Sequence, residues 1–186
     1  CVKYYSSKKK LYYIYNKCNK FNKYYFTPKD NIDLKIAVDD WCMNREQTIL
    51  EYGHISFWNT INITSMEELF QNRQEFNNNI SDWNISNVID MSYMFNSAYK
   101  FNQPIGNWNT SNIINMTGIF WNAYEFNQPI NNWNTSSVIN MESIFNTAHN
   151  FNQPLNNWDV SNVITMSSMF DWTKKFNQPI NNWNVS

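Results

Sequence analysis

The sequence predicts an α/β solenoid, in which coils of a short parallel strand plus a short helix stack behind a helical N-terminal cap. Three observations predict it. Apolar residues within a unit change from alternate positions to steps of three and four, and F-N-Q-P phrases end the later units. A tryptophan recurs every 25 residues without an insertion, at Trp58, Trp83, Trp108, Trp133, Trp158 and Trp183. Periods of about 20 to 50 residues are typical of stacked arrays, whose units bury their apolar faces against each other.

The start of each unit predicts the strand. Leu155, Trp158 and Val160 have the L-x-x-L-x-L spacing of a leucine-rich repeat strand, in which alternate side chains point to one face. The coils are therefore predicted to be leucine-rich-repeat-like.

The middle of each unit predicts the helix. Val163, Met166, Met169 and Phe170 recur at helical spacing, and either Ser161 or Thr165 can provide the N-cap. The F-N-Q-P phrase then ends the helix, because proline lacks the backbone donor and disfavours a helical residue before it.

Charge and pattern divide the chain into three regions. Residues 1–27 carry seven lysines and no acid, and form a Lys/Tyr-rich arm. Residues 28–57 predict a helical cap, in which Asn44 starts a second helix, Gly53 ends it, and the first helix has an apolar face of Leu34, Ala37, Val38 and Trp41. The repeats occupy residues 58–186, in units 58–82, 83–107, 108–132, 133–157 and 158–182 and a partial unit 183–186.

Two sets of repeated residues have structural interpretations. The tryptophans, with Trp83, Trp108, Trp133 and Trp158 as the central ones, are predicted to be core residues. A second set follows the last Phe of each unit and can satisfy backbone groups at a corner, as a structural ladder of Asn77, Asn102, Asn127, Asn152 and Asn177.

A third set is the candidate binding face. It alternates with the inward residues of the predicted strands and faces out on the sheet; its members are Asn107, Asn109, Asn132, Asn134, Asn157 and Asp159. Trp121 and Trp172 lie off the repeating pattern and are candidates for an exposed contact. Solvent exposure alone is the structural alternative, and protein or glycan is the expected ligand.

The motifs F-N-Q-P-[IL]-x-N-W-[ND]-[TV]-S-[NS]-V and M-x-x-[MI]-F-x-x-A resemble the BspA-like leucine-rich repeat family of surface proteins. This family includes a domain of unknown function common in mycoplasma lipoproteins, with copies in giant DNA viruses. The resemblance covers residues 58–186 and extends upstream to Leu34. The first unit departs from the pattern at Ile61, Arg73 and Asn79. The resemblance implies binding, adhesion or structural display, without shared catalytic residues.

The residues themselves predict no enzyme, cofactor or metal site. His54 and His149 stand far apart in the array, and Cys1, Cys18 and Cys42 lack the paired spacing of a zinc site. A glycine-rich phosphate loop is absent, as is an apolar run of membrane-spanning length. The N-x-[ST] matches at Asn84, Asn109 and Asn134 arise from the repeated W-N-x-S phrase and are weak indications of glycosylation.

The expected function is therefore a non-enzymatic repeat protein that mediates protein-protein contacts. It would be a structural or surface component of a giant-virus particle (virion) or a cell-surface adhesin, with a lipid anchor if Cys1 is a mature N-terminus. The alternative is that the basic arm binds nucleic acid or an anionic surface while the solenoid serves as scaffold. Because the partial unit 183–186 begins a strand with no helix after it, the C-terminal coil is expected to contact further repeats or a neighbouring subunit.

Overall fold

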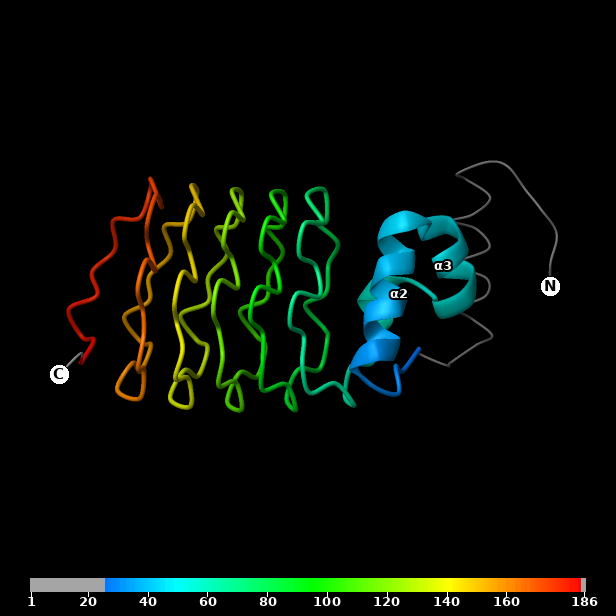
Figure 1. The fold of residues 1–186 in the computed structure, drawn as a ribbon, viewed down its shortest axis with the longest axis horizontal. Coiled ribbons are helices and arrows are strands. Elements are labelled where there is room, and N and C mark those ends of the chain that lie inside the picture. Colours follow the sequence, from blue (N-terminus) through cyan, green and yellow to red (C-terminus); the bar gives the residue numbers. More distant parts are fainter. Residues whose placement is uncertain (1–25, 185–186) are drawn as a thin grey trace.

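The computed structural model describes residues 26–184. Two helices, α2 (Asn31–Met43) and α3 (Arg45–Tyr52), are followed by a single 3₁₀ turn, η1 (Ile55–Phe57). From there the chain winds into a row of similar coils, with α2 and α3 at one end of the row (Figure 1). The predicted arm, including Cys1 and Cys18, lies outside the described residues except for Phe26 and Thr27.

The predicted fold class is wrong, because the coils do not consist of a strand and a helix. Between residues 58 and 184 the structure contains turns and no helix or strand, so it is not an α/β solenoid of strand-plus-helix coils. Successive coils share single parallel β-bridges, at Ser65–Asp90, Asp90–Asn115, Asn115–Asn140 and Asn140–Thr165. The candidate binding face therefore does not lie on a sheet.

Consecutive β-turns occupy the segment predicted to be helical. In the second unit, Asn96 and Ala98 donate their N–H groups within the coil, whereas the N–H groups of Tyr93, Phe95 and Ser97 donate to the next coil. Tyr93 and Ser97 also have left-handed backbones, with φ of 55° and 59°. A helix would keep all these bonds within the segment. Consecutive turns can place apolar side chains at steps of three and four residues, as a helix does. The spacing alone therefore led to the wrong prediction of a helix.

The segment predicted to be a strand also consists of turns. The N–H of Trp158 donates to the carbonyl of Leu155, and that of Val163 to Val160, so the chain bends twice where a strand would run straight. Side chains join the coils here: the indole Nε1 of Trp158 donates to the Ile130 carbonyl at 3.0 Å. Side-chain donors thus replace the backbone ladder that a parallel sheet would have.

Rows of stacked aromatic rings fill the core. Phe95 and Phe120 have ring centroids 5.7 Å apart and planes within 1°, and Trp108 and Trp133 are 6.4 Å apart. The four central tryptophans, Trp83, Trp108, Trp133 and Trp158, are all buried. In the last coil Phe170 is only partly buried. That this coil contacts a neighbouring subunit stays a prediction.

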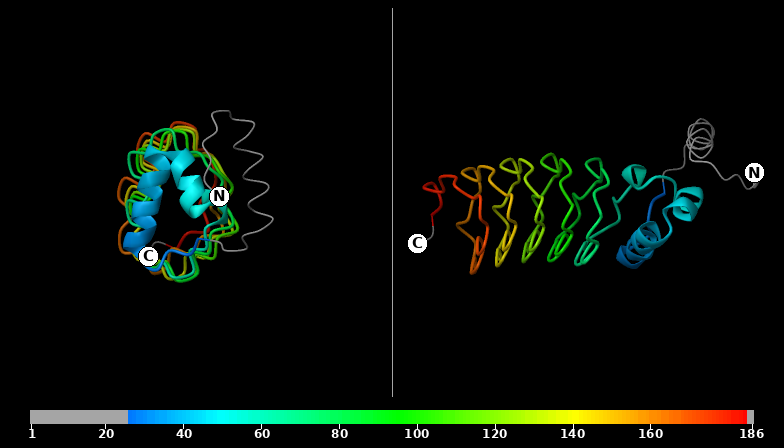
Figure 2. Two further views of the ribbon diagram at one scale, coloured as in Figure 1. Left: turned by 90° about the vertical axis from the view of Figure 1, so that its right-hand side faces the viewer. Right: turned by 90° about the horizontal axis from the view of Figure 1, so that it is seen from above.

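The two helices lie across the end of the first coil, as the view along the array shows (Figure 2). Asp30 caps α2 by accepting the N–H of Asp33, and the helix buries Leu34, Ala37, Val38 and Trp41. Asn44 caps α3, which ends at Gly53 with φ of 75°. Asn31 extends the backbone pairing of the coils to α2, because its Oδ1 accepts the N–H of Thr64 at 2.9 Å. No helix within residues 26–184 is long and apolar enough to cross a membrane.

Candidate binding surfaces

The asparagine ladder links neighbouring coils through side-chain oxygens. The Oδ1 of Asn102 accepts the backbone N–H of Asn127 at 2.9 Å and the Nε2 of Gln128 at 3.0 Å. The same pair of bonds recurs from Asn77, Asn127 and Asn152 to the coil that follows each of them. Asn177, in the last complete coil, donates its own N–H to the Oδ1 of Asn152. These side chains serve the array itself.

The predicted binding face is exposed, but three of its six side chains also accept hydrogen bonds from nearby backbone N–H groups. Asn107, Asn109, Asn132, Asn134, Asn157 and Asp159 are all exposed. The Oδ1 of Asn109 accepts both the N–H and the Oγ–H of Ser111, at 3.2 and 2.8 Å. Asn134 and Asp159 make the same turn with the serine two residues later. The W-N-x-S phrase is therefore a turn motif, in which an Asn or Asp oxygen satisfies local donors.

Asp159 differs from Asn109 and Asn134 in being ionisable. The side chain and the backbone N–H of Ser161 both donate to its carboxylate and lower its pKa. Both bonds favour the charged form, because a carboxylate accepts hydrogen bonds more strongly than a carboxylic acid does.

Trp121 and Trp172 do not form one site. Trp121 is half-buried and packs on Tyr93, with ring centroids 6.3 Å apart. Trp172 stands two coils further on, 76% exposed, at a left-handed backbone position with φ of 57°. Of the two, only Trp172 is largely exposed.

Sequence reasoning missed a row of exposed isoleucines, here called the isoleucine row. It consists of Ile89, Ile114, Ile139 and Ile164, which are 48%, 42%, 42% and 83% exposed. A signal was available in the apolar pairs of the repeat, such as Val88–Ile89 and Val138–Ile139. Neighbouring residues of an extended segment point in opposite directions, so only one residue of each pair reaches the core.

A second surface row contains aromatic rings and one histidine. Tyr99 stacks on Tyr124 with centroids 4.5 Å apart, and Tyr124 on His149 with centroids 5.0 Å apart. Burial, together with the neighbouring Tyr99, raises the pKa of Tyr124. The Nδ1 of His149 lies 3.1 Å from the carbonyl oxygen of Trp172. His149 is thus a member of a stack.

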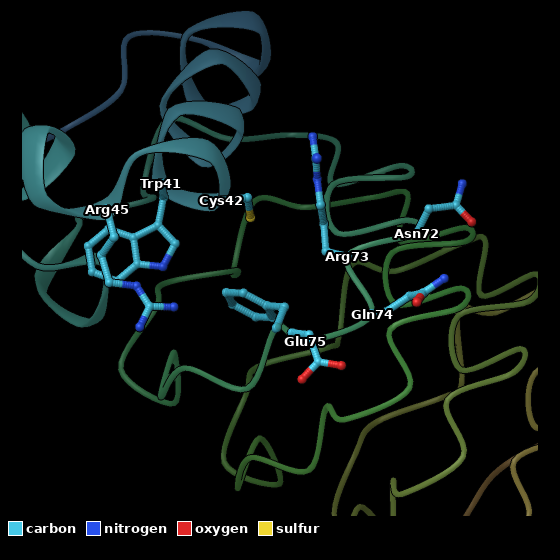
Figure 3. Close-up of a pocket in the computed structure, with 8 residues that line it drawn as sticks. Trp41, Cys42, Arg45, Asn72, Arg73, Gln74 and Glu75 are labelled. Atoms are coloured by element: carbon cyan, nitrogen blue, oxygen red, sulfur yellow. The ribbon is translucent and has the colours of Figure 1, made fainter.

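A pocket of about 300 Å³ lies between the helical end and the first coil (Figure 3). Trp41, Cys42 and Arg45 line one side, and residues 72–76 line the other. Arg73, which departs from the repeat pattern, makes an ion pair with Asp39 of α2 at 2.5 Å. The guanidinium of Arg45 lies 5.2 Å from the ring centroid of Trp41.

Two titratable groups near this pocket have shifted pKa values. Burial raises the pKa of the Cys42 thiol; Arg73 and Arg45 oppose that rise, and Asp39 adds to it. Burial, with a smaller effect of Arg45, lowers the pKa of His54, whose ring packs edge-on against Trp41. No group of three or more His, Cys, Asp or Glu side chains that could hold a metal ion occurs within residues 26–184.

The repeats match a known protein family. A family model described as "Mycoplasma protein of unknown function, DUF285" matches the chain twice, over residues 41–142 and 105–186. The chain belongs to this family. Two overlapping matches of one family model are what a repeated unit produces, so the family membership and the 25-residue period agree. No curated protein and no solved structure matches the chain.

Proposed function

We propose that this repeat protein of the DUF285 family is non-enzymatic and binds another protein along the isoleucine row. The row is the single observation that carries the proposal. Isolated exposed apolar side chains are normal on protein surfaces, but a contiguous set of them is typical of an interaction site. Here four large aliphatic side chains repeat at one position of successive coils, each at least 42% exposed.

The backbone holds the isoleucine row in register. The N–H of Ile114 donates to the carbonyl of Ile89 at 2.9 Å, that of Ile139 to Ile114 at 2.9 Å, and that of Ile164 to Ile139 at 2.8 Å. Residues paired in this way lie about 4.8 Å apart. A partner therefore meets a preformed line of side chains, and little conformational entropy is lost when it binds.

Side chains at the neighbouring positions form hydrogen bonds within the chain, whereas the isoleucine side chains have no polar group that could do so. Asn112, two residues before Ile114, donates its Nδ2 to a carbonyl of the preceding coil at 2.7 Å. Asn115, on the other side, accepts the N–H of Thr117 at 3.0 Å through its Oδ1. Contact with another molecule explains why Ile is repeated at a position that contributes little to the core.

The proposed location is an outer surface, of a cell or of a virus particle. The repeat phrases resemble those of the BspA-like leucine-rich repeat surface proteins. We include a relationship to that family in the proposal. Adhesion to a host protein or structural display in a particle would both use the row. A glycan is a less suitable ligand for it, because aliphatic side chains offer no hydrogen bonds to hydroxyl groups.

The test uses the whole chain as bait on surface material of the source organism or particle. Wild type is compared with the double variant Ile114→Ser/Ile139→Ser, and bound proteins are quantified by mass spectrometry. A specific partner should bind wild type and be lost from the double variant. With the purified partner, the dissociation constant of the double variant should rise at least about tenfold, since truncated apolar anchors commonly cost that much.

The matched control is Ile36→Ser/Leu50→Ser, which removes two exposed apolar side chains from α2 and α3. It should retain the partner. All four substituted side chains are exposed, so both double variants should keep the wild-type melting temperature. Equal recovery of every protein by the three baits would contradict the proposal.

A further inference from the structure

The pocket between α3 and the first coil contains two opposite charges that do not pair with each other. Arg45 and Glu75 both line it and both are exposed. The ion pairs within residues 26–184 are Arg73–Asp39 and Lys100–Glu125, so neither Arg45 nor Glu75 is in one, although the charge of Glu75 also acts on Lys100 of the next coil. In Figure 3 the side chains of Arg45 and Glu75 come from opposite walls and both point to the lower part of the view, whereas Arg73 points upward, away from them.

Arg45 is held in place before any ligand arrives. Its guanidinium packs over the Trp41 ring, and its Nη2 donates to the Oδ1 of Asn78 at 3.2 Å. The indole Nε1 of Trp41 donates to the same oxygen at 3.2 Å. A guanidinium has five N–H groups, so most of its donors remain for a carboxylate, which it can bind through two parallel bonds.

Glu75 comes from a hydrogen-bonded turn of the first coil. It lies in the turn closed by the N–H of Phe76 and the carbonyl of Arg73, at 2.9 Å. Phe76 and Cys42, from opposite walls, add apolar surface to the lining of the pocket. The pocket therefore combines an anion-binding group, a cation-binding group and a small apolar wall.

We infer that this pocket binds a small zwitterion of the α-amino acid type, with the carboxylate on Arg45 and the ammonium group on Glu75. A simple anion would be repelled by Glu75, and a simple cation by Arg45. The volume of about 300 Å³ is at the lower end of small-molecule sites, which suits one amino acid with an apolar side chain. This site is independent of the isoleucine row.

The test is a titration of the full chain followed by NMR. The indole N–H signal of Trp41 reports on the pocket directly. L-leucine serves as the probe, with N-acetyl-leucine, which lacks the ammonium group, and leucine amide, which lacks the carboxylate. L-leucine should shift the Trp41 signal in a saturable way, and each half-ligand should bind at least about tenfold more weakly, because each loses one charge-assisted contact.

Glu75→Gln is the decisive variant, because Glu75 is exposed and its replacement should leave the fold intact. It should weaken L-leucine binding at least about tenfold. Glu142→Gln is the matched control, since Glu142 is exposed, makes no ion pair within residues 26–184 and does not line the pocket, and it should bind normally. Arg45→Lys, which keeps the charge but loses the planar fork, should give an intermediate affinity.

Two outcomes would overturn the inference. One is the absence of a saturable shift with L-leucine at millimolar concentration. The other is tighter binding of N-acetyl-leucine than of L-leucine, or stronger binding after Glu75→Gln, which would make the pocket a plain anion site.

Discussion

The side-chain oxygen of Asn127 accepts the backbone N–H of Asn152 at 2.9 Å, across the boundary between two coils. The same oxygen accepts the Nε2 of Gln153 at 3.1 Å. One carboxamide therefore satisfies two donors of the next coil at a corner where no β-bridge is present.

Replacing Asn127 by Ala should lower the free energy of unfolding by about 1 to 3 kcal/mol, because two partly buried donors lose their acceptor. Chemical denaturation measures the change. Asn132→Ala is the control, since Asn132 is exposed, and it should have little effect. An unchanged denaturation midpoint for Asn127→Ala would mean that the ladder bonds contribute nothing net relative to water.

Trp133→Ala should be the more costly of two tryptophan deletions. Trp133 is 2% exposed, stacks on tryptophans of both neighbouring coils and donates its Nε1 to Ile105 at 3.0 Å. Its removal should cost about 3 to 5 kcal/mol, the usual range for a buried aromatic residue. Trp121→Ala removes a half-buried ring and should cost clearly less. Equal losses of stability in thermal melts would show that the inward and outward positions are assigned incorrectly.

The stability contribution of Asp159 should depend on pH in the acid range. The two hydrogen bonds from Ser161 lower its folded-state pKa, so the carboxylate stabilises the fold above the ordinary value of about 4. That contribution is lost as the pH falls through the lowered folded-state pKa. In Asp159→Asn this acid-range dependence should disappear.

The pKa of Asp159 can be followed through its side-chain carbonyl signal by NMR. In Ser161→Ala the hydroxyl donor is removed, so the pKa should rise toward its ordinary value. A titration curve that is the same in wild type and Ser161→Ala would rule out the hydroxyl as the cause.

Cys42 should react with iodoacetamide only at a higher pH than a free thiol does. Alkylation requires the thiolate, and burial raises the pKa of this thiol. Peptide mapping by mass spectrometry isolates Cys42 from the other cysteines, with N-acetylcysteine as the reference. Arg73→Gln removes a cation that opposes the rise, so its profile should move to still higher pH. A profile at or below that of N-acetylcysteine would contradict this account.

Some features of the protein follow directly from the order of residue types along the sequence. The 25-residue period, the rows of Trp and Phe, and the caps Asn44 and Gly53 of α3 can all be read along the chain. They are local properties, because apolar residues in register must share a core and because capping residues act within a few positions. The isoleucine row was equally readable, since one residue of each apolar pair has to face outward.

The tertiary structure alone decided how the coils are built. Apolar spacing is the same for a helical turn and for a series of β-turns, and the two differ in where the N–H groups donate. Here the acceptor of Phe95 is Ile119 in the next coil, a partner that no pattern within one unit specifies. The same holds for the pocket, which Arg45 and Glu75 both line only because the helical end packs on the first coil. Contacts between distant segments depend on packing in three dimensions, and the sequence by itself determined the periodic rows that pack and the local caps of α3.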